Sequence, residues 1–162
     1  MDDNFSPKVR DVITFSKEEA LRLGHDFIGT EHLLLGLIRK GDGKAIEILL
    51  TLEIDLNLIR KKLEILNPAA SSILEGNKKK SLHLTRQAEK ALKTTFLEAK
   101  LYQSEAIDTA HLLLCILRNE NDPSTKLLNK YDVDYDQAKA LYKELHTDTN
   151  HEILPSNPIA ET

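Results

Sequence analysis

The feature that most constrains the fold of this chain is a segment that occurs twice. GTEHLLLGLIR runs from Gly29 to Arg39, and DTAHLLLCILR runs from Asp108 to Arg118. Subtracting position 30 from position 109 gives an offset of 79, which maps residues 5–66 onto residues 84–145 without a gap. A repeat of this length predicts two similar units, each too small to bury its hydrophobic face alone, that pack against one another.

Apolar positions outside the repeated segment keep the same phase in both copies. In the first copy they recur at steps of three and four residues, which is typical of one face of an amphipathic helix. Each stripe has a serine or threonine at the same place, Ser16 in the first and Thr95 in the second. The first stripe is Phe5, Val9, Val12, Ile13, Ser16, Ala20 and Leu23, and the second is Leu84, Ala88, Ala91, Leu92, Thr95, Ala99 and Tyr102.

The signals for helix ends also recur. Ser6 before Pro7 is typical of an N-cap with proline in the first turn, and Thr85 is its counterpart in the second copy. Gly24 indicates the end of the first helix. Thr30 and Thr109 predict the N-caps of the second helix of each copy. That second helix is apolar nearly all round, so we expect it at the centre of a core.

Two further helices complete each copy. We expect the third helix over residues 44–50 and 124–130, and the fourth after Asp55 and after Asp134. In the first copy the third helix follows a loop, Gly41-Asp42-Gly43. The sequence therefore predicts an all-α fold of eight helices, built as two tandem four-helix repeats related by a pseudo-twofold axis.

These patterns divide the chain into one domain and a tail. The domain is expected over residues 1–147, with repeat 1 at about 5–66, a connector at 67–83 and repeat 2 at about 84–146. Residues 148–162 contain two prolines and no periodicity, which indicates a linker.

Composition restricts the functional classes. The net charge is −4, so there is no overall basic surface for nucleic acid, and the run Lys78-Lys79-Lys80 is interpreted as a solvated loop. A single cysteine excludes an internal disulfide and a cysteine zinc site. The start of the sequence has no secretory signal, and no apolar run spans a bilayer. We expect a soluble, cytoplasmic protein without a membrane partner.

Catalytic chemistry is not indicated by any motif. GLIRKGDGK, residues 36–44, resembles a phosphate-binding loop only superficially, because Asp42 stands where the loop needs lysine. His111 and Cys115 lie one helical turn apart, but on the most apolar helix, which favours a buried structural cysteine over a nucleophilic pair. His32 and His111 recur in both copies and are interpreted as core histidines bonded to a neighbouring backbone carbonyl. No metal site is predicted.

Glu31 is the position where the copies differ most in chemistry, because Ala110 replaces it. An acid in the first turn is favoured by the helix dipole, and that interpretation needs no ligand. The same geometry also suits recognition, since free N–H groups at a helix start hold anions and a carboxylate pairs with a guanidinium. Both interpretations remain open, and either places the difference at the surface.

The stretch EEALRLGHDFIGTEHLLLGLIRKGDG, residues 18–43, resembles the N-terminal repeat domain of the Clp family of AAA+ unfoldase ATPases, most closely the ClpC type. The resemblance covers about residues 5–145 as two repeats. The second copy departs from the family pattern, with Gln103-Ser104 for the usual Gly-His and Ala110 for the usual Glu.

This resemblance implies a domain that binds protein substrates and adaptor proteins and delivers them to a hexameric ATPase, which feeds a Clp peptidase. The isolated domain is expected to be monomeric and without a cofactor, with ATP and magnesium held by ATPase modules outside these residues. It implies phosphoarginine or adaptor binding at Thr30, Glu31 and Thr109, with Glu31 contacting the guanidinium. The alternative is a stand-alone adaptor or regulatory helical protein without ATPase modules.

Overall fold

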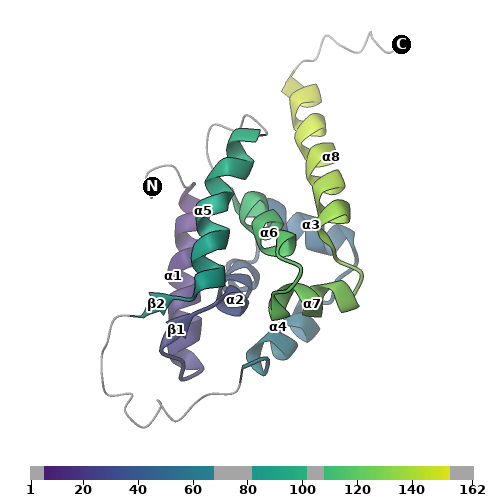
Figure 1. The fold of residues 1–162 in the computed structure, drawn as a ribbon. Helices are drawn as coiled ribbons and strands as arrows, with labels where there is room; N and C mark the ends of the chain where they lie inside the picture. The colour runs from purple at the N-terminus through teal and green to yellow at the C-terminus, as the bar shows by residue number, and fades with distance from the viewer. Residues whose placement is uncertain (1–5, 68–81, 102–107, 154–162) are drawn as a thin grey trace.

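The computed structural model describes residues 6–67, 82–101 and 108–153, which form eight helices and two short strands (Figure 1). The first repeat contains α1 (Pro7–Arg22), β1 (Phe27–Ile28), α2 (Thr30–Lys40), α3 (Lys44–Thr51) and α4 (Leu56–Glu64). The second contains β2 (His83–Leu84), α5 (Arg86–Leu101), α6 (Thr109–Arg118), α7 (Pro123–Lys130) and α8 (Tyr135–Ile153). The all-α class and the two four-helix repeats are confirmed.

Side chains at the helix ends explain why α1 and α5 begin where they do. Ser6 Oγ accepts a hydrogen bond from the Val9 N–H at 3.3 Å, ahead of Pro7 in the first turn. Thr85 Oγ1 accepts from the Ala88 N–H at 3.1 Å in the same way. After α1 the backbone of Gly24 has a φ of 79°, a left-handed conformation that glycine adopts without strain.

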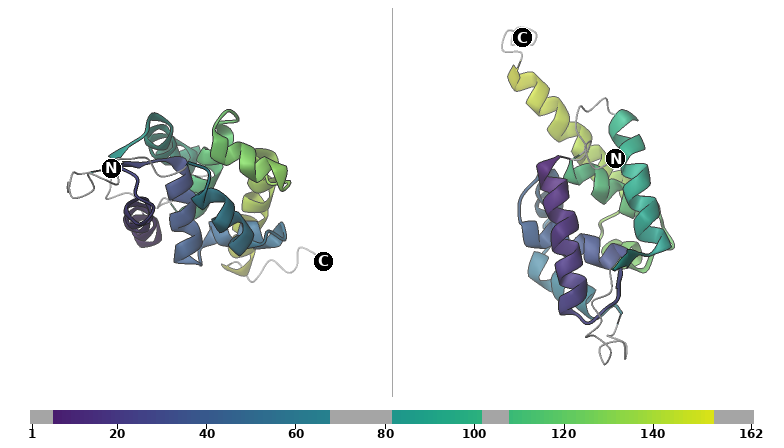
Figure 2. Two further views of the ribbon diagram at one scale, coloured as in Figure 1. Left: turned by 90° about the horizontal axis from the view of Figure 1, so that it is seen from below. Right: turned by 90° about the vertical axis from the view of Figure 1, so that its left-hand side faces the viewer.

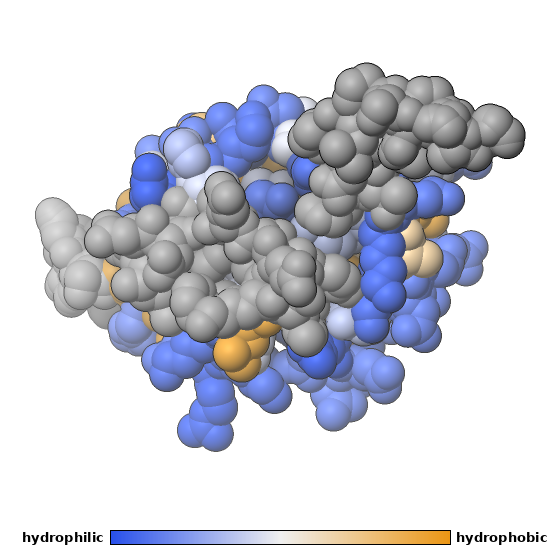
Figure 3. Space-filling view, turned by 90° about the horizontal axis from the view of Figure 1, so that it is seen from above, coloured by the Kyte–Doolittle hydropathy of each residue, from blue (hydrophilic) through white to orange (hydrophobic). Residues whose placement is uncertain are grey.

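The core is formed around α2 and α6, which are buried nearly all round as predicted. α1 covers α2 and α5 covers α6 through the apolar stripes. The two hydroxyl groups in these stripes are satisfied inside the core, since Ser16 donates to the Val12 carbonyl at 2.7 Å and Thr95 donates to the Ala91 carbonyl at 2.6 Å. The described part of the face seen in Figure 3 is mainly hydrophilic, with small separate hydrophobic patches.

The repeats are interlocked rather than set side by side. α3 of the first repeat packs against α6 and α8 of the second, and α4 contacts α7. α1 and α5 lie roughly parallel on the same side of the molecule, apart from each other, while the end of α8 extends beyond the other helices (Figure 2). The fourth helices contact the central helix of their own repeat, α4 with α2 and α8 with α6, so the main crossing contacts of the third and fourth helices are those of α3 and of α4 with α7. This arrangement agrees with the predicted pseudo-twofold axis.

Two features differ from the sequence prediction. Leu84, expected in the first helical stripe of repeat 2, lies in β2, which pairs in parallel with β1 in the register Phe27 with His83 and Ile28 with Leu84. Helix α8 continues to Ile153, so residues 148–153, expected at the start of a linker, are helical. The triple-lysine run, most of the connector and residues 154–162 lie outside the described residues. Among the described helices none is both long and apolar enough to span a membrane.

Candidate binding site at the starts of the central helices

The two threonines predicted as N-caps occupy a different position. The N-cap of α2 is Gly29 and that of α6 is Asp108, so Thr30 and Thr109 are the first helical residues and the N-cap prediction is wrong. The reason lies three residues further along each helix. The ring nitrogen of His32 accepts a hydrogen bond from the Gly29 N–H at 2.8 Å, and His111 accepts from the Asp108 N–H at 2.9 Å. Each histidine therefore closes its own helix start as the reciprocal half of a capping box.

Thr30 and Thr109 instead bind the opposite repeat. Thr30 Oγ1 lies 2.9 Å from Asp122 Oδ1 and 2.9 Å from Ser124 Oγ, at the start of α7. Thr109 Oγ1 accepts a hydrogen bond from the Ala45 N–H at 3.0 Å, at the start of α3. Ala45 and Ser124 are themselves 79 positions apart, so the two threonines meet matched positions of the opposite repeat. Both threonines are buried, but only Thr109 caps the third helix of the other repeat directly. The N-cap of α7 is Asp122, and the Thr30 hydroxyl donates to the carboxylate of that cap.

Glu31 was expected at the surface, but only 6% of the residue is exposed. Its Oε2 accepts a hydrogen bond from the side-chain amide of Asn67 at 2.8 Å. Its Oε1 lies 2.5 Å from the position that a Cβ on Gly29 would occupy, so the carboxylate folds back over a residue that has no side chain. The surface placement of Glu31 is therefore wrong, and ligand binding by Thr30, Glu31 and Thr109 stays a prediction about buried groups.

The predicted burial of both histidines is confirmed, but the predicted backbone carbonyl is not their partner. His32 Nε2 lies 2.8 Å from His25 Nδ1, and His25 Nε2 lies 2.8 Å from the carbonyl of Asn67. Nδ1 of His32 accepts a hydrogen bond from the Gly29 N–H, so the proton of the neutral His32 ring is on Nε2. This N–H points towards Nδ1 of His25. Burial, and then the neighbouring His25, lower the pKa of His32 from 6.5 to about 4. His32 is therefore neutral at pH 7.

His111 and Cys115 do not form a nucleophile and base. His111 Nε2 lies 3.1 Å from the hydroxyl of Tyr142, and its other ring nitrogen accepts from the helix start. Cys115 is buried, as predicted. Both ring nitrogens of His111 are therefore engaged, one with the helix start and one with Tyr142 of α8, which leaves neither to act as a base for Cys115.

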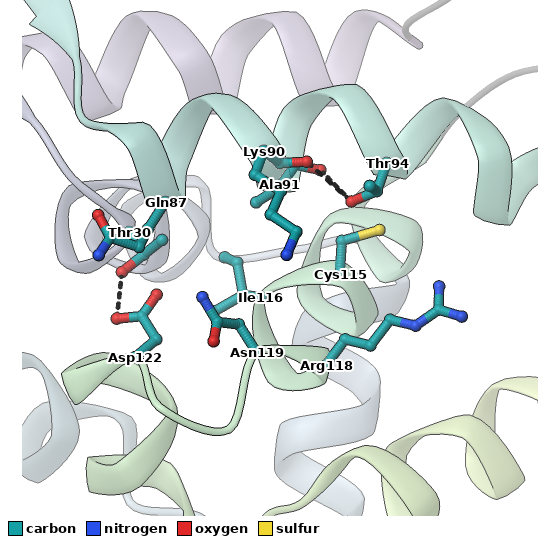
Figure 4. A pocket seen from close by; sticks show the side chains of 10 residues that line it. All are labelled: Thr30, Gln87, Lys90, Ala91, Thr94, Cys115, Ile116, Arg118, Asn119 and Asp122. Carbon is teal, nitrogen blue, oxygen red and sulfur yellow. Dashed lines mark hydrogen bonds between the residues drawn. The ribbon is translucent and has the colours of Figure 1, made fainter.

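A cavity of about 370 Å³ lies between α5, α6 and the start of α7 (Figure 4). Thr30 of the first repeat reaches its edge, and its walls include Lys90, Thr94, Cys115, Asn119 and Asp122. Sequence analysis missed this site, because its members come from three helices and Asp122 indicated only a helix start. No described cluster of three or more His, Cys, Asp or Glu side chains has the geometry to hold a metal ion.

Asp122 is the most unusual group in this cavity. Its Oδ1 accepts from Thr30 at 2.9 Å and from the Ser124 N–H at 3.1 Å. Its Oδ2 has no hydrogen-bond partner among the described residues, although only 3% of Asp122 is exposed. Burial raises the pKa of this carboxyl, the two hydrogen bonds oppose that rise, and the nearby Glu31 adds to it. A buried carboxylate oxygen without a partner is rare in folded proteins.

These observations define a class: an all-helical domain of two interlocked four-helix repeats, in which the start of each central helix is buried against the start of the other repeat's third helix. The family model for the Clp repeat (R) N-terminal domain matches residues 4–150. The chain belongs to that family.

The relatives in sequence carry Clp names. The chain is 33% identical to the Bacillus subtilis negative regulator of genetic competence ClpC/MecB over 135 residues, which are 83% of this chain and 16% of that protein. It is 33% identical over 159 residues to a probable ATP-dependent Clp protease ATP-binding subunit of Chlamydia pneumoniae, covering 97% of this chain and 18% of that protein. The chain thus spans less than a fifth of the length of these relatives.

Solved structures share the fold. The Hsp104 N-terminal domain from Candida albicans superimposes with a TM-score of 0.72 at 13% identity, over 88% of this chain and 91% of that one. The N-domain of ClpV from Vibrio cholerae gives a TM-score of 0.74 at 11% identity, over 90% of this chain and 87% of that one. At these identities the likeness establishes the fold alone.

Proposed function

We propose that this chain is the N-terminal domain of a Clp-type AAA+ ATPase subunit, where it binds protein substrates and adaptor proteins and delivers them for unfolding. The family match over residues 4–150 carries this proposal, together with relatives that are ATP-binding subunits. The domain itself performs no catalysis. ATP and magnesium are held by ATPase modules elsewhere in the subunit, whose hexamer delivers the unfolded chain to a Clp peptidase.

The exposed surface suits binding to a protein partner through small hydrophobic contacts surrounded by polar ones. Large exposed hydrophobic side chains are scattered over several helices rather than gathered on one, namely Leu21, Leu50, Leu58, Ile65 and Leu97. The face in Figure 3 shows the same pattern. Short hydrophobic contacts among charges suit the reversible binding of an adaptor or substrate, which must be released to the ATPase.

The delivery role is tested in the full-length subunit that carries this domain. Deletion of residues 1–153 is expected to abolish adaptor-dependent degradation of a substrate and to leave basal ATP hydrolysis within twofold of the intact subunit. Degradation that is unchanged after deletion contradicts the proposal. A coding sequence downstream of Thr162 that lacks a Walker A motif would instead favour a stand-alone adaptor, which should bind a Clp hexamer as a separate chain.

We also propose that the first repeat recognises phosphoarginine through Glu31. The carboxylate lies at a helix start and already accepts a hydrogen bond from an amide, that of Asn67 at 2.8 Å, in the way that it would accept one from a guanidinium. The ligand must therefore displace this amide. Thr30 and Thr109 support the site by fixing the two helix starts. Ala110 offers no carboxylate, so we expect one site rather than two.

Calorimetric titration of the isolated chain with a phosphoarginine peptide tests this assignment. Glu31→Ala and Glu31→Gln are expected to weaken binding by roughly tenfold or more, since a hydrogen bond between charged groups is lost. Asn67→Ala is expected to tighten it, because the competing amide is gone. The same peptide with unmodified arginine is the control. Equal binding by the wild type and Glu31→Ala would sink the assignment.

A further inference from the structure

The cavity between α5 and α6 is found in the second repeat only, among the described residues. In the first repeat, the residues at the matched positions pair with one another and fill the space. In the first repeat Arg39 stacks on the ring of Phe15 at 4.5 Å, and Lys40 pairs with Asp11 at 3.1 Å. The offset of 79 carries these two pairs to Arg118 with Thr94, and to Asn119 with Lys90. Thr94 is too small to fill the space of a phenyl ring. Lys90 stands where the first repeat has the acid Asp11, and Asn119 stands where it has Lys40, so the second repeat has no ion pair at this place. The second repeat therefore keeps an open space where the first is filled.

The charges around this space are separated. Asp122 lies at one end with Oδ2 directed into the cavity, and the nearby Glu31 adds to the negative potential there. At the other end the ammonium group of Lys90 points into the cavity, beside the amide of Asn119 (Figure 4). In the first repeat Gly43 stands at the position of Asp122, so the carboxylate has no counterpart there. A ligand that satisfies both ends needs a hydrogen-bond donor at one end and an anion at the other.

We propose that this cavity binds a small zwitterion, an ω-guanidino or ω-amino carboxylic acid, with its cationic end on Asp122 and its carboxylate on Lys90. Asp122 Oδ2 then gains the hydrogen bond that it lacks, from a donor whose charge offsets its own. The volume of about 370 Å³ falls within the usual range for ligand pockets, roughly 300–1,000 Å³. This site adjoins the one proposed at Glu31, since Thr30 borders both, but it has its own ligand groups and does not rest on the delivery function.

Titration of the complete chain with 4-guanidinobutyrate and 6-aminohexanoate tests the proposal. For ligands of this size we expect a Kd of roughly 1 mM. Hexanoate lacks the cation and n-butylammonium lacks the anion, so each is expected to bind at least tenfold more weakly. Equal affinity for all four compounds would overturn the proposal. So would the absence of binding by any of them at ligand concentrations up to about 50 mM, fifty times the expected Kd.

Three variants assign the two ends. Asp122→Asn keeps the shape and, since asparagine is also a good N-cap, the start of α7, yet it is expected to weaken binding at least tenfold. Lys90→Gln should weaken the zwitterions to the level of n-butylammonium. Lys93→Gln is the matched control on the same helix, where Lys93 pairs with Glu89 at 3.4 Å, and should leave binding unchanged.

One competing arrangement gives the opposite result. If Lys90 turns inward and satisfies Asp122 itself, Lys90→Gln should make n-butylammonium bind more tightly, and that outcome would also refute the proposal. Circular dichroism melts of each variant show whether a loss of binding reflects a loss of folding. Should Asp122→Asn fail to fold, the Lys90→Gln and Lys93→Gln pair still decides the matter.

Discussion

The first repeat places a carboxylate on the second residue of its central helix, whereas the second repeat places one on the residue before the helix. Glu31 folds back over Gly29, which has no side chain, and Asp108 stands at the position of Gly29 with its Oδ1 bonded to the Ala110 N–H at 2.8 Å. The acid that disappears from GTEH to DTAH is therefore moved by two residues rather than lost. Each helix start keeps one negative charge, as the helix dipole favours.

The moved carboxylate has different surroundings in the two repeats. Asp108 serves its own helix, while Glu31 contacts Asn67, which belongs to a distant part of the chain. A group that satisfies only its own helix is sufficient for folding. A group that reaches a distant residue is also available to a ligand that replaces that residue. The comparison thus supports a functional role in the first repeat and a structural role in the second.

The central histidines have different partners in the two repeats, since His32 contacts His25 whereas His111 contacts Tyr142. The dependence of stability on pH, which reports on His32, is the prediction with the largest expected effect. The pKa of His32 is lowered from 6.5 to about 4, so the unfolded chain binds its proton more tightly. The associated stability is complete above pH 6.5 and is lost as the pH falls towards 4, on the order of 3 kcal/mol. Urea denaturation across this range should show the slope, and His32→Gln should reduce it. A midpoint near 6.5 for His32 in an NMR titration would contradict the assignment.

Gly36 of α2 lies against α1, and the matched residue of α6 is Cys115, so substitutions at these two positions test how closely the first two helices of each repeat pack. A Cβ on Gly36 would lie 2.5 Å from Ser16 Oγ and 2.6 Å from the Val12 carbonyl, whereas the second repeat accommodates Cys115 at the matched position. Gly36→Cys should therefore lower the free energy of unfolding by about 2 kcal/mol. Cys115→Ala is the control and should lower it by about 1 kcal/mol or less. A Gly36→Cys variant as stable as the wild type would show that the helices separate freely.

The threonines test whether the two repeats depend on each other. Thr109→Val leaves the buried Ala45 N–H without its acceptor and should destabilise the fold by about 1 kcal/mol, with a similar effect for Thr30→Val. Thr51 donates to the Glu47 carbonyl on the exposed face of α3, so Thr51→Val should change little. Chemical denaturation measures all three. Effects of equal size at the three sites would argue against a stabilising role for the hydrogen bonds between the repeats.

The smallest net effect is expected when the first repeat is given the pattern of the second. Gly29→Asp alone forces Glu31 aside, and Glu31→Ala alone removes the charge at the helix start. The double variant restores one carboxylate at the N-cap, so it should be about as stable as the wild type, with a coupling of roughly 1 kcal/mol between the two changes. Additive losses in a double-mutant cycle would show that the two carboxylates are not equivalent.

Much of the fold follows from local patterns in the chain. The steps of three and four residues predicted the buried faces of α1 and α5, including Ser16 and Thr95, because a helical period is a property of neighbouring residues. The same reasoning misassigned Thr30, since a threonine before an apolar helix is a typical N-cap. It also placed Glu31 at the surface, because charged side chains are seldom buried.

What the sequence determined by itself was the duplication, the all-helical class and the two apolar central helices, since these depend on composition and spacing within each repeat. The tertiary structure alone decided how the repeats interlock. Thr30 and Asp122 are 92 positions apart, and no periodic pattern relates them. Their meeting depends on the start of α7 lying against the start of α2. The burial of Glu31 likewise depends on a residue distant in sequence, Asn67, whose amide donates to its carboxylate.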